Sequence, residues 1–82
     1  MSFLLRDKPA RVFSLLKNKS TYLSDIAKET GTTYVYITHL ISFLQQKGLV
    51  TIQSTGKKKT VLLTEKGKEV ANAVEDLRRK LE

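Results

Sequence analysis

The chain contains no cysteine and only one histidine among its 82 residues. A disulfide, a thiolate metal site and a cysteine nucleophile are therefore excluded, and a single histidine cannot complete a zinc site. The sequence also shows no phosphate-binding glycine loop and no nucleophile paired with a base. We expect no metal and no cofactor, and enzymatic activity is the least supported interpretation.

A long apolar run is also missing. The first apolar segment covers residues 3–5 and ends at residues 6–8, which are Arg, Asp and Lys. It is much shorter than a signal-peptide core or the roughly 20 residues that span a membrane. We therefore expect a cytoplasmic protein with no membrane partner. No repeat or Pro/Ser-rich linker interrupts the chain, and a chain of this length builds one hydrophobic core.

Acidic residues are scarce relative to basic ones. Fifteen Lys and Arg face eight Asp and Glu, which leaves a net charge of +7. On so short a chain this excess favours a polyanionic partner, such as nucleic acid or an acidic membrane surface. Solubility alone is the competing explanation for the charge. Because 40% of the residues are hydrophobic, the chain is expected to fold.

Local signals predict a helix, a short extended segment and a second helix. Asp7 can cap the first helix, with Pro9 in its first turn, and apolar residues then recur at helical spacing as far as residues 17–19. Residues 21–23 are predicted to be extended. Ser24 can then cap a short helix that stops at Gly31.

A third helix is predicted at about residues 33–47, with Thr32 or Thr33 as its cap and Gly48 at its end. Its apolar residues fall on one stripe, which is formed by Ile37, Leu40, Ile41 and Leu44.

After Gly48 the hydrophobic period changes to two, which predicts two strands joined by a basic turn at residues 54–60. Thr64 can cap a last helix that runs from Glu65 to the C-terminus. The order is helix, short strand, helix, helix, two-stranded wing and C-terminal helix. The predicted fold class is α+β, mostly α, with the arrangement of a winged helix-turn-helix.

Three segments carry a family resemblance. Residues 23–31 resemble the first helix and turn of a helix-turn-helix, and residues 37–50 resemble a recognition helix that leads into a wing. Residues 63–67, Leu-Thr-Glu-Lys-Gly, resemble the start of the post-wing helix in winged helix regulators of the multiple-antibiotic-resistance (MarR-like) type. Each segment is a weak signal alone, but their order and separation are specific. The resemblance covers residues 20–68 and implies double-stranded DNA as the partner.

The chain departs from that family at its N-terminus. Family members usually carry longer N-terminal helices that help to form a dimer and a small-molecule pocket, whereas this chain starts almost at the core. We therefore expect no small-molecule ligand, and a minimal archaeal or viral winged helix regulator is the alternative relative. Residues 1–68 are predicted to form the DNA-binding domain, and residues 69–82 a helical extension for dimerisation.

The outward face of the third helix is the predicted reading surface, since the major groove admits one helix and the N-terminal half of that helix reads the bases. The expected DNA-contacting residues are Thr33, Tyr34, Val35, Tyr36, Thr38, His39 and Ser42. Hydroxyl groups can bond phosphates or base edges, and Val35 can touch a thymine methyl group. The face has no arginine, which indicates weak G·C readout, modest specificity or reliance on DNA shape.

Some of these residues have a second interpretation. Tyr34 can instead pack in the core beside Ile37, whereas Tyr36 is expected on the outer arc in contact with DNA. His39 is interpreted as solvated or in contact with phosphate, not as catalytic or metal-binding.

Lys57, Lys58 and Lys59 are predicted at the hairpin tip beside Gly56, where their ammonium groups can contact phosphates. A solvated edge that prevents strand-to-strand aggregation is the alternative.

The last helix carries a narrow apolar seam with spacings of four, three and four residues, suited to a two-helix contact. The predicted dimer interface consists of Val70, Val74, Leu77 and Leu81. Alternatively, Val70 and Val74 pack on the chain's own first helix, and a partner chain covers only Leu77 and Leu81. A two-fold dimer would place two recognition helices on half-sites roughly 34 Å apart.

These observations favour a homodimeric transcriptional regulator that binds double-stranded DNA with some sequence dependence. A winged-helix protein–protein adaptor is the first alternative, because fold alone does not fix function. A non-specific architectural protein or an RNA-binding protein is the second.

Overall fold

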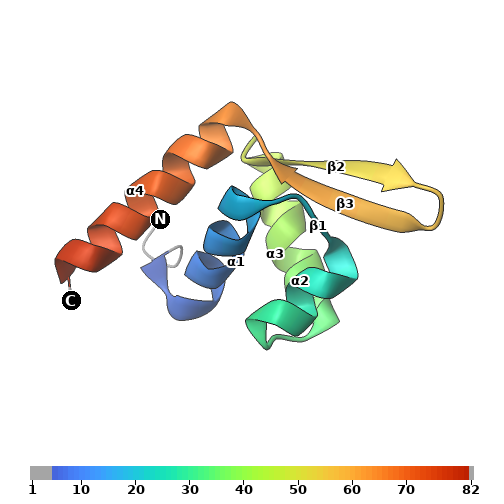
Figure 1. The fold of residues 1–82 in the computed structure, drawn as a ribbon, viewed down its shortest axis with the longest axis horizontal. Helices are drawn as coiled ribbons and strands as arrows, with labels where there is room; N and C mark the ends of the chain where they lie inside the picture. Colours follow the sequence, from blue (N-terminus) through green and yellow to red (C-terminus); the bar gives the residue numbers. More distant parts are fainter. Residues whose placement is uncertain (1–4, 82) are drawn as a thin grey trace.

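The computed structural model describes residues 5–81 and shows four helices and three strands (Figure 1). In chain order they are α1 (Asp7–Asn18), β1 (Thr21–Tyr22), α2 (Leu23–Thr30), α3 (Tyr34–Gln46), β2 (Val50–Thr55), β3 (Lys58–Leu63) and α4 (Glu65–Leu81). This order confirms the predicted mostly helical α+β winged helix. Two predictions extend beyond the described residues. Residues 3 and 4 of the N-terminal apolar segment and residue 82, the predicted end of the last helix, lie outside them.

Two predicted helix caps are wrong. Arg6 occupies the cap position of α1 without a side-chain bond, and Asp7 is the first helical residue, where its carboxylate pairs with Arg11 at 2.9 Å. Ser24 does not cap α2 either, because the helix already begins at Leu23. The backbone of β1 stays extended as far as Tyr22, where it pairs with Thr60, and turns directly into the helix.

Other predicted signals are confirmed. Gly31 ends α2 in the left-handed conformation with φ 67°, which glycine adopts without steric cost. The Thr33 hydroxyl caps α3 by accepting a bond from the Tyr36 backbone N–H at 3.0 Å. The end of α2 at Gly31 and the cap of α3 at Thr33 could therefore each be predicted from a single residue.

The three strands form one antiparallel sheet in the order β1-β3-β2. Short β1 extends the predicted two-stranded wing by pairing Thr21 with Val61, whose side chain is fully buried. Pairing between β2 and β3 runs as far as Thr55 and Lys58. The turn is therefore only two residues long, and of the three lysines Lys57 alone lies at the tip. The prediction that Lys58 and Lys59 also lie at the tip is wrong, because both are strand residues of β3.

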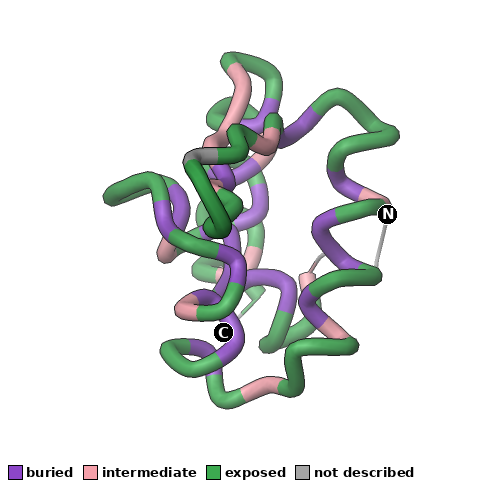
Figure 2. The backbone as a smooth tube through the Cα atoms, turned by 90° about the vertical axis from the view of Figure 1, so that its right-hand side faces the viewer, coloured by how far each residue is buried: buried purple, intermediate pink, exposed green. Residues whose placement is uncertain are grey.

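The inner stripe of α3 fills the centre of the molecule. Ile37, Ile41 and Leu44 are at most 1% exposed, and they join a core that contains Phe13 of α1 and Ile26 of α2. In Figure 2 the buried segments lie mostly toward the interior of the molecule and the exposed segments lie mostly around it. The predicted inward face of α3 is therefore confirmed.

Thr64 fastens α4 to the base of the wing. Its hydroxyl donates to the Gly48 carbonyl at 2.7 Å and accepts from the Gly67 backbone N–H at 2.9 Å, which confirms it as the cap of α4. Its backbone N–H donates to the Leu49 carbonyl at 3.0 Å. These bonds join the end of α3 to the start of α4, so the two helices and the hairpin between them are held as one unit.

Gly67 allows this close approach. It is buried, and a Cβ at this position would overlap the Leu49 carbonyl oxygen and lie 3.1 Å from a Leu63 methyl carbon.

We predict that Gly67→Ala lowers the free energy of unfolding by about 1–3 kcal/mol, the usual cost of overpacking, even though alanine favours a helix by about 1 kcal/mol over glycine. Urea unfolding followed by circular dichroism measures the change. Asn72→Ala, at an exposed position of α4, is the control and should not destabilise the protein. An unchanged or raised unfolding midpoint for Gly67→Ala would contradict this account.

Candidate nucleic-acid interface

The start of α3 presents side chains to solvent. Val35 is 65% exposed and Tyr34 is 54% exposed, while Thr38, His39 and Ser42 further along the helix are also exposed. Tyr34 therefore does not pack in the core beside Ile37. Six of the seven predicted contact residues lie on accessible surface, counting the exposed cap residue Thr33.

Tyr36 is the seventh, and its predicted place on the outer arc is wrong. Its ring is partly buried and packs against the core, and it lines a hollow with Pro9 of α1 and Phe43 of α3. The Lys8 ammonium group lies 5.6 Å from the ring centre. The start of α1 covers this flank of α3, and that packing decides the position of Tyr36.

Two of the threonine hydroxyls are already engaged in the backbone of α3. Thr33 accepts the capping bond from Tyr36, and the Thr38 hydroxyl donates to the Tyr34 carbonyl at 2.9 Å. The hydroxyl hydrogen of Thr38 is therefore directed at its own helix, and only the oxygen lone pairs are left for a partner.

The wing and the start of α3 meet at one hollow in the surface. Its lining consists of Tyr22, Leu23, Ser24, Tyr34, Lys57, Lys58 and Lys59. All three lysines are exposed, and Tyr34 comes from the helix predicted to read DNA. The two parts of the predicted surface, which are far apart in the sequence, are therefore adjacent in space.

Tyr22 belongs to this surface and was not predicted from the sequence. It is 38% exposed, and the Lys58 ammonium group lies 4.5 Å from the centre of its ring, a cation–π contact. Tyr22 pairs with Thr60, and a residue two positions along the partner strand is a diagonal neighbour on the same face. That neighbour is Lys58, so the contact could be predicted only once the pairing of β1 with β3 was known.

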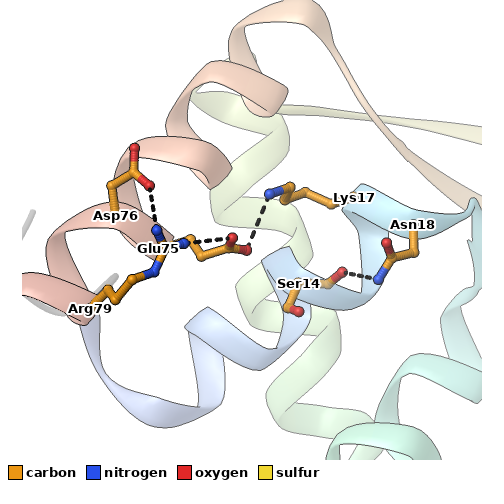
Figure 3. Close-up of polar contacts among 6 residues, drawn as sticks. All are labelled: Ser14, Lys17, Asn18, Glu75, Asp76 and Arg79. Atoms are coloured by element: carbon orange, nitrogen blue, oxygen red, sulfur yellow. Dashed lines mark hydrogen bonds and ion pairs between the residues drawn. The ribbon is translucent and has the colours of Figure 1, made fainter. Parts of the chain in front are cut away.

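Positive charge on α1 and α4 is largely compensated. Figure 3 shows Glu75 of α4 between Lys17 of α1, at 3.1 Å, and Arg79, at 3.2 Å, with Asp76 also 3.6 Å from Arg79. Asp7 of α1 pairs with Arg78 of α4 at 3.6 Å. In contrast, none of the three wing lysines forms an ion pair with a carboxylate among residues 5–81. The unpaired positive charge of the hairpin therefore lies beside the exposed start of α3.

The predicted dimer seam divides into two pairs. Val74 is 7% exposed and lines a groove with Phe13 of α1, and Val70 is partly buried against the core. For Val74 the alternative of packing within the chain is correct, because its side chain is not available to a partner. Leu77 and Leu81, by contrast, are 44% and 69% exposed.

Within the described helices, none has both the length and the apolar character needed to cross a bilayer. The same residues contain no group of three or more His, Asp or Glu side chains placed to hold a metal ion.

The fold and this exposed helix define the chain as a winged helix protein, a fold typical of DNA-binding transcription regulators. The chain belongs to the DUF6293 C-terminal winged helix domain family, which matches residues 13–75. A comparison with curated protein sequences finds no match.

Solved structures with the same fold include several transcription regulators. The archaeal protein AF1382 from Archaeoglobus fulgidus has a TM-score of 0.85 at 19% identity, with 99% of this chain and 94% of that protein covered. MepR, a transcription regulator of the Staphylococcus aureus multidrug efflux pump MepA, has a TM-score of 0.83 at 19% identity. The match covers 98% of this chain and 62% of MepR. The homodimeric DNA-binding domain of Mb0332 from Mycobacterium bovis, described as a possible ArsR-family regulator, has a TM-score of 0.81 at 18% identity, with coverage of 96% and 74%. These neighbours confirm the fold.

The capping bond of Thr33 gives a test of how the start of α3 is built. We predict that Thr33→Ala lowers the free energy of unfolding by about 0.5–2 kcal/mol, because a backbone N–H loses its acceptor, and that Thr33→Ser restores most of the loss. Thr38→Ala on the same helix is the matched control. Its hydroxyl caps nothing, and alanine is the better helix former, so stability should not fall. Equal losses at the two positions in urea unfolding would be inconsistent with a cap at Thr33.

Proposed function

We propose that the chain is a transcriptional regulator that binds double-stranded DNA as a homodimer, with some dependence on sequence. The observation that carries the proposal is the single hollow that brings Tyr34 of α3 together with the three lysines of the hairpin. A helix that enters the major groove at this point has the lysines of the wing at its side, without carboxylate partners, where phosphates of the same duplex run.

In this arrangement the segment of about residues 33–47, which contains α3, lies in the major groove. The wing, residues 54–60, lies along the phosphate backbone or over the adjacent minor groove. Lys57 projects from the turn, whereas Lys58 and Lys59 follow each other along β3 and so point to opposite faces of the sheet. Lys58 is held against Tyr22, which orders its ammonium group before DNA binds.

The dimer is proposed through the C-terminal part of the chain, residues 69–82. Two exposed leucines, Leu77 and Leu81, lie one helical turn apart on α4 and share one face. Burial of Ala71 and Val74 fixes α4 against the core, and the ion pairs Lys17–Glu75 and Asp7–Arg78 add to this only slightly. The two leucines are therefore presented on a helix with a defined position. Homodimerisation of the similar Mb0332 domain supports the proposal. Two-fold symmetry would place two copies of α3 on half-sites about 34 Å apart.

A protein–protein adaptor is the competing function, because winged helices also occur in that role. The uncompensated lysines favour DNA. Salt distinguishes the two functions, since binding to DNA releases counterions and weakens steeply with salt.

Neutralising the wing should weaken binding to any duplex. We predict that changing Lys57, Lys58 and Lys59 together to Gln lowers DNA affinity and reduces the slope of log K against log salt by about 2–3, because each lost phosphate contact removes roughly 0.9. Fluorescence anisotropy over a salt series measures both quantities. The control changes three exposed lysines of α4, Lys66, Lys68 and Lys80, to Gln, which removes the same charge elsewhere. Equal effects from the two variants would refute a specific role of the wing. Absence of binding by the wild-type protein at low salt would refute DNA binding itself.

The dimer is tested by placing a charge on the exposed seam. We predict that Leu77→Glu shifts the protein from dimer to monomer in sedimentation and lowers its apparent affinity for DNA, because a buried unpaired carboxylate disfavours the interface. Asn72→Glu is exposed on the same helix and should leave the dimer intact. A monomeric wild-type protein at the same concentration would rule out this dimer.

Selection of bound duplexes from a random pool tests specificity and symmetry together. A palindromic consensus supports a two-fold dimer with sequence preference, whereas an unenriched pool indicates an architectural role.

A further inference from the structure

The start of the recognition helix is unusual in its chemistry. Residues 33–46 contain no Lys, Arg, Asp, Glu or Asn, and their two glutamines, at positions 45 and 46, lie at the far end of α3. The side chains that read guanine and adenine by paired hydrogen bonds are therefore absent from the half of the helix that meets the bases.

Hydroxyl groups supply little to replace them at this point. The Thr38 hydroxyl donates its hydrogen to the Tyr34 carbonyl, and the Thr33 hydroxyl oxygen accepts the capping bond from the Tyr36 backbone N–H. Thr38 therefore offers a base only acceptor lone pairs, whereas Thr33 keeps its O–H donor at the cap position. A single bond from a threonine hydroxyl distinguishes bases weakly, because it can be made to more than one base.

His39 and Ser42 are exposed only further along the helix, and the first turn of α3 presents mainly apolar surface. Val35, the second residue of the helix, is 65% exposed, and the preceding residue Tyr34 is 54% exposed. Neither side chain contributes to the core. In the major groove, the only aliphatic group that an unmodified base pair presents is the C5-methyl group of thymine.

We propose that Val35 recognises thymine methyl groups, and that the protein prefers sites with thymine at the contacted positions. The inference deepens the proposed function and rests on it: the wing lysines supply sequence-independent affinity, and Val35 supplies the preference. Affinity and selectivity are thus carried by different elements, the hairpin and the start of α3.

Replacing thymine by uracil removes only the methyl group and leaves every hydrogen-bonding group of the base in place. Random-sequence duplexes enriched on the wild-type protein are amplified once with thymidine and once with deoxyuridine triphosphate, and their affinities are compared. We expect the uracil pool to bind about 3- to 10-fold more weakly, the effect of one or two buried methyl groups.

The variants separate the methyl contact from other effects of uracil. Val35→Ala, which suits a helix, should weaken binding to the thymine pool by a similar factor and leave the uracil pool unchanged. Lys57→Gln is the control and should weaken binding to both pools equally. Equal binding of wild-type protein to the two pools, or an equal loss for Val35→Ala on both, would overturn the methyl contact while leaving DNA binding intact. Failure to bind either pool at low salt would overturn the proposed function and the inference together.

Discussion

The burial of one side of α3 is the constraint on which the rest of this structure depends. Ile37, Ile41 and Leu44 are almost completely removed from solvent, and each such side chain contributes about 1.5–3 kcal/mol when buried. Because they recur at helical spacing, their burial fixes the rotation of the helix about its axis. Val35, Thr38 and Ser42 must then face outward, and the face available to a partner follows directly from the core.

The proposed dimer contact on α4 and the proposed DNA contact at the wing differ in their charge. Around α4, the carboxylates of Glu75, Asp76 and Asp7 neutralise neighbouring basic side chains on α1 and α4. Exposed ion pairs of this kind stabilise the fold only slightly, but they leave little net charge beside the exposed leucines. At the hairpin the lysines have no such partners. The same small core therefore presents a nearly neutral apolar edge on one helix and a basic edge on the wing.

Much of the fold could be predicted from the sequence because its signals are local. Gly31, Thr33 and Thr64 each act on the residues next to them, and the apolar period of α3 needs only the helix itself. The close approach at Gly67 was visible only as part of a family-like motif. Its physical cause, the carbonyl of Leu49, required the three-dimensional contact.

Except for the cap at Asp7, the errors arose where two distant segments decide a position. Ser24 is a residue type that often caps helices. However, β1 pairs with β3 as far as Tyr22 and α2 begins at the next residue, so Ser24 lies inside the helix. Tyr36 faces away from the centre of the apolar stripe, yet the start of α1 covers it. Lys58 and Lys59 were assigned to a turn that strand pairing shortens to two residues. No local pattern indicates such contacts. Most residues of the site were therefore predictable, whereas Tyr22 and the geometry of the site were not.

The central claim is that the outer face of α3 and the wing form one DNA-binding surface. Backbone amide shifts of the isotope-labelled protein, measured by NMR during titration with a short duplex, test this claim directly. We predict that the largest changes occur at Tyr34, Val35 and Thr38 and at Lys57–Lys59, while Leu77 and Leu81 change little. Changes centred on α4, with the start of α3 and the wing unaffected, would contradict the account.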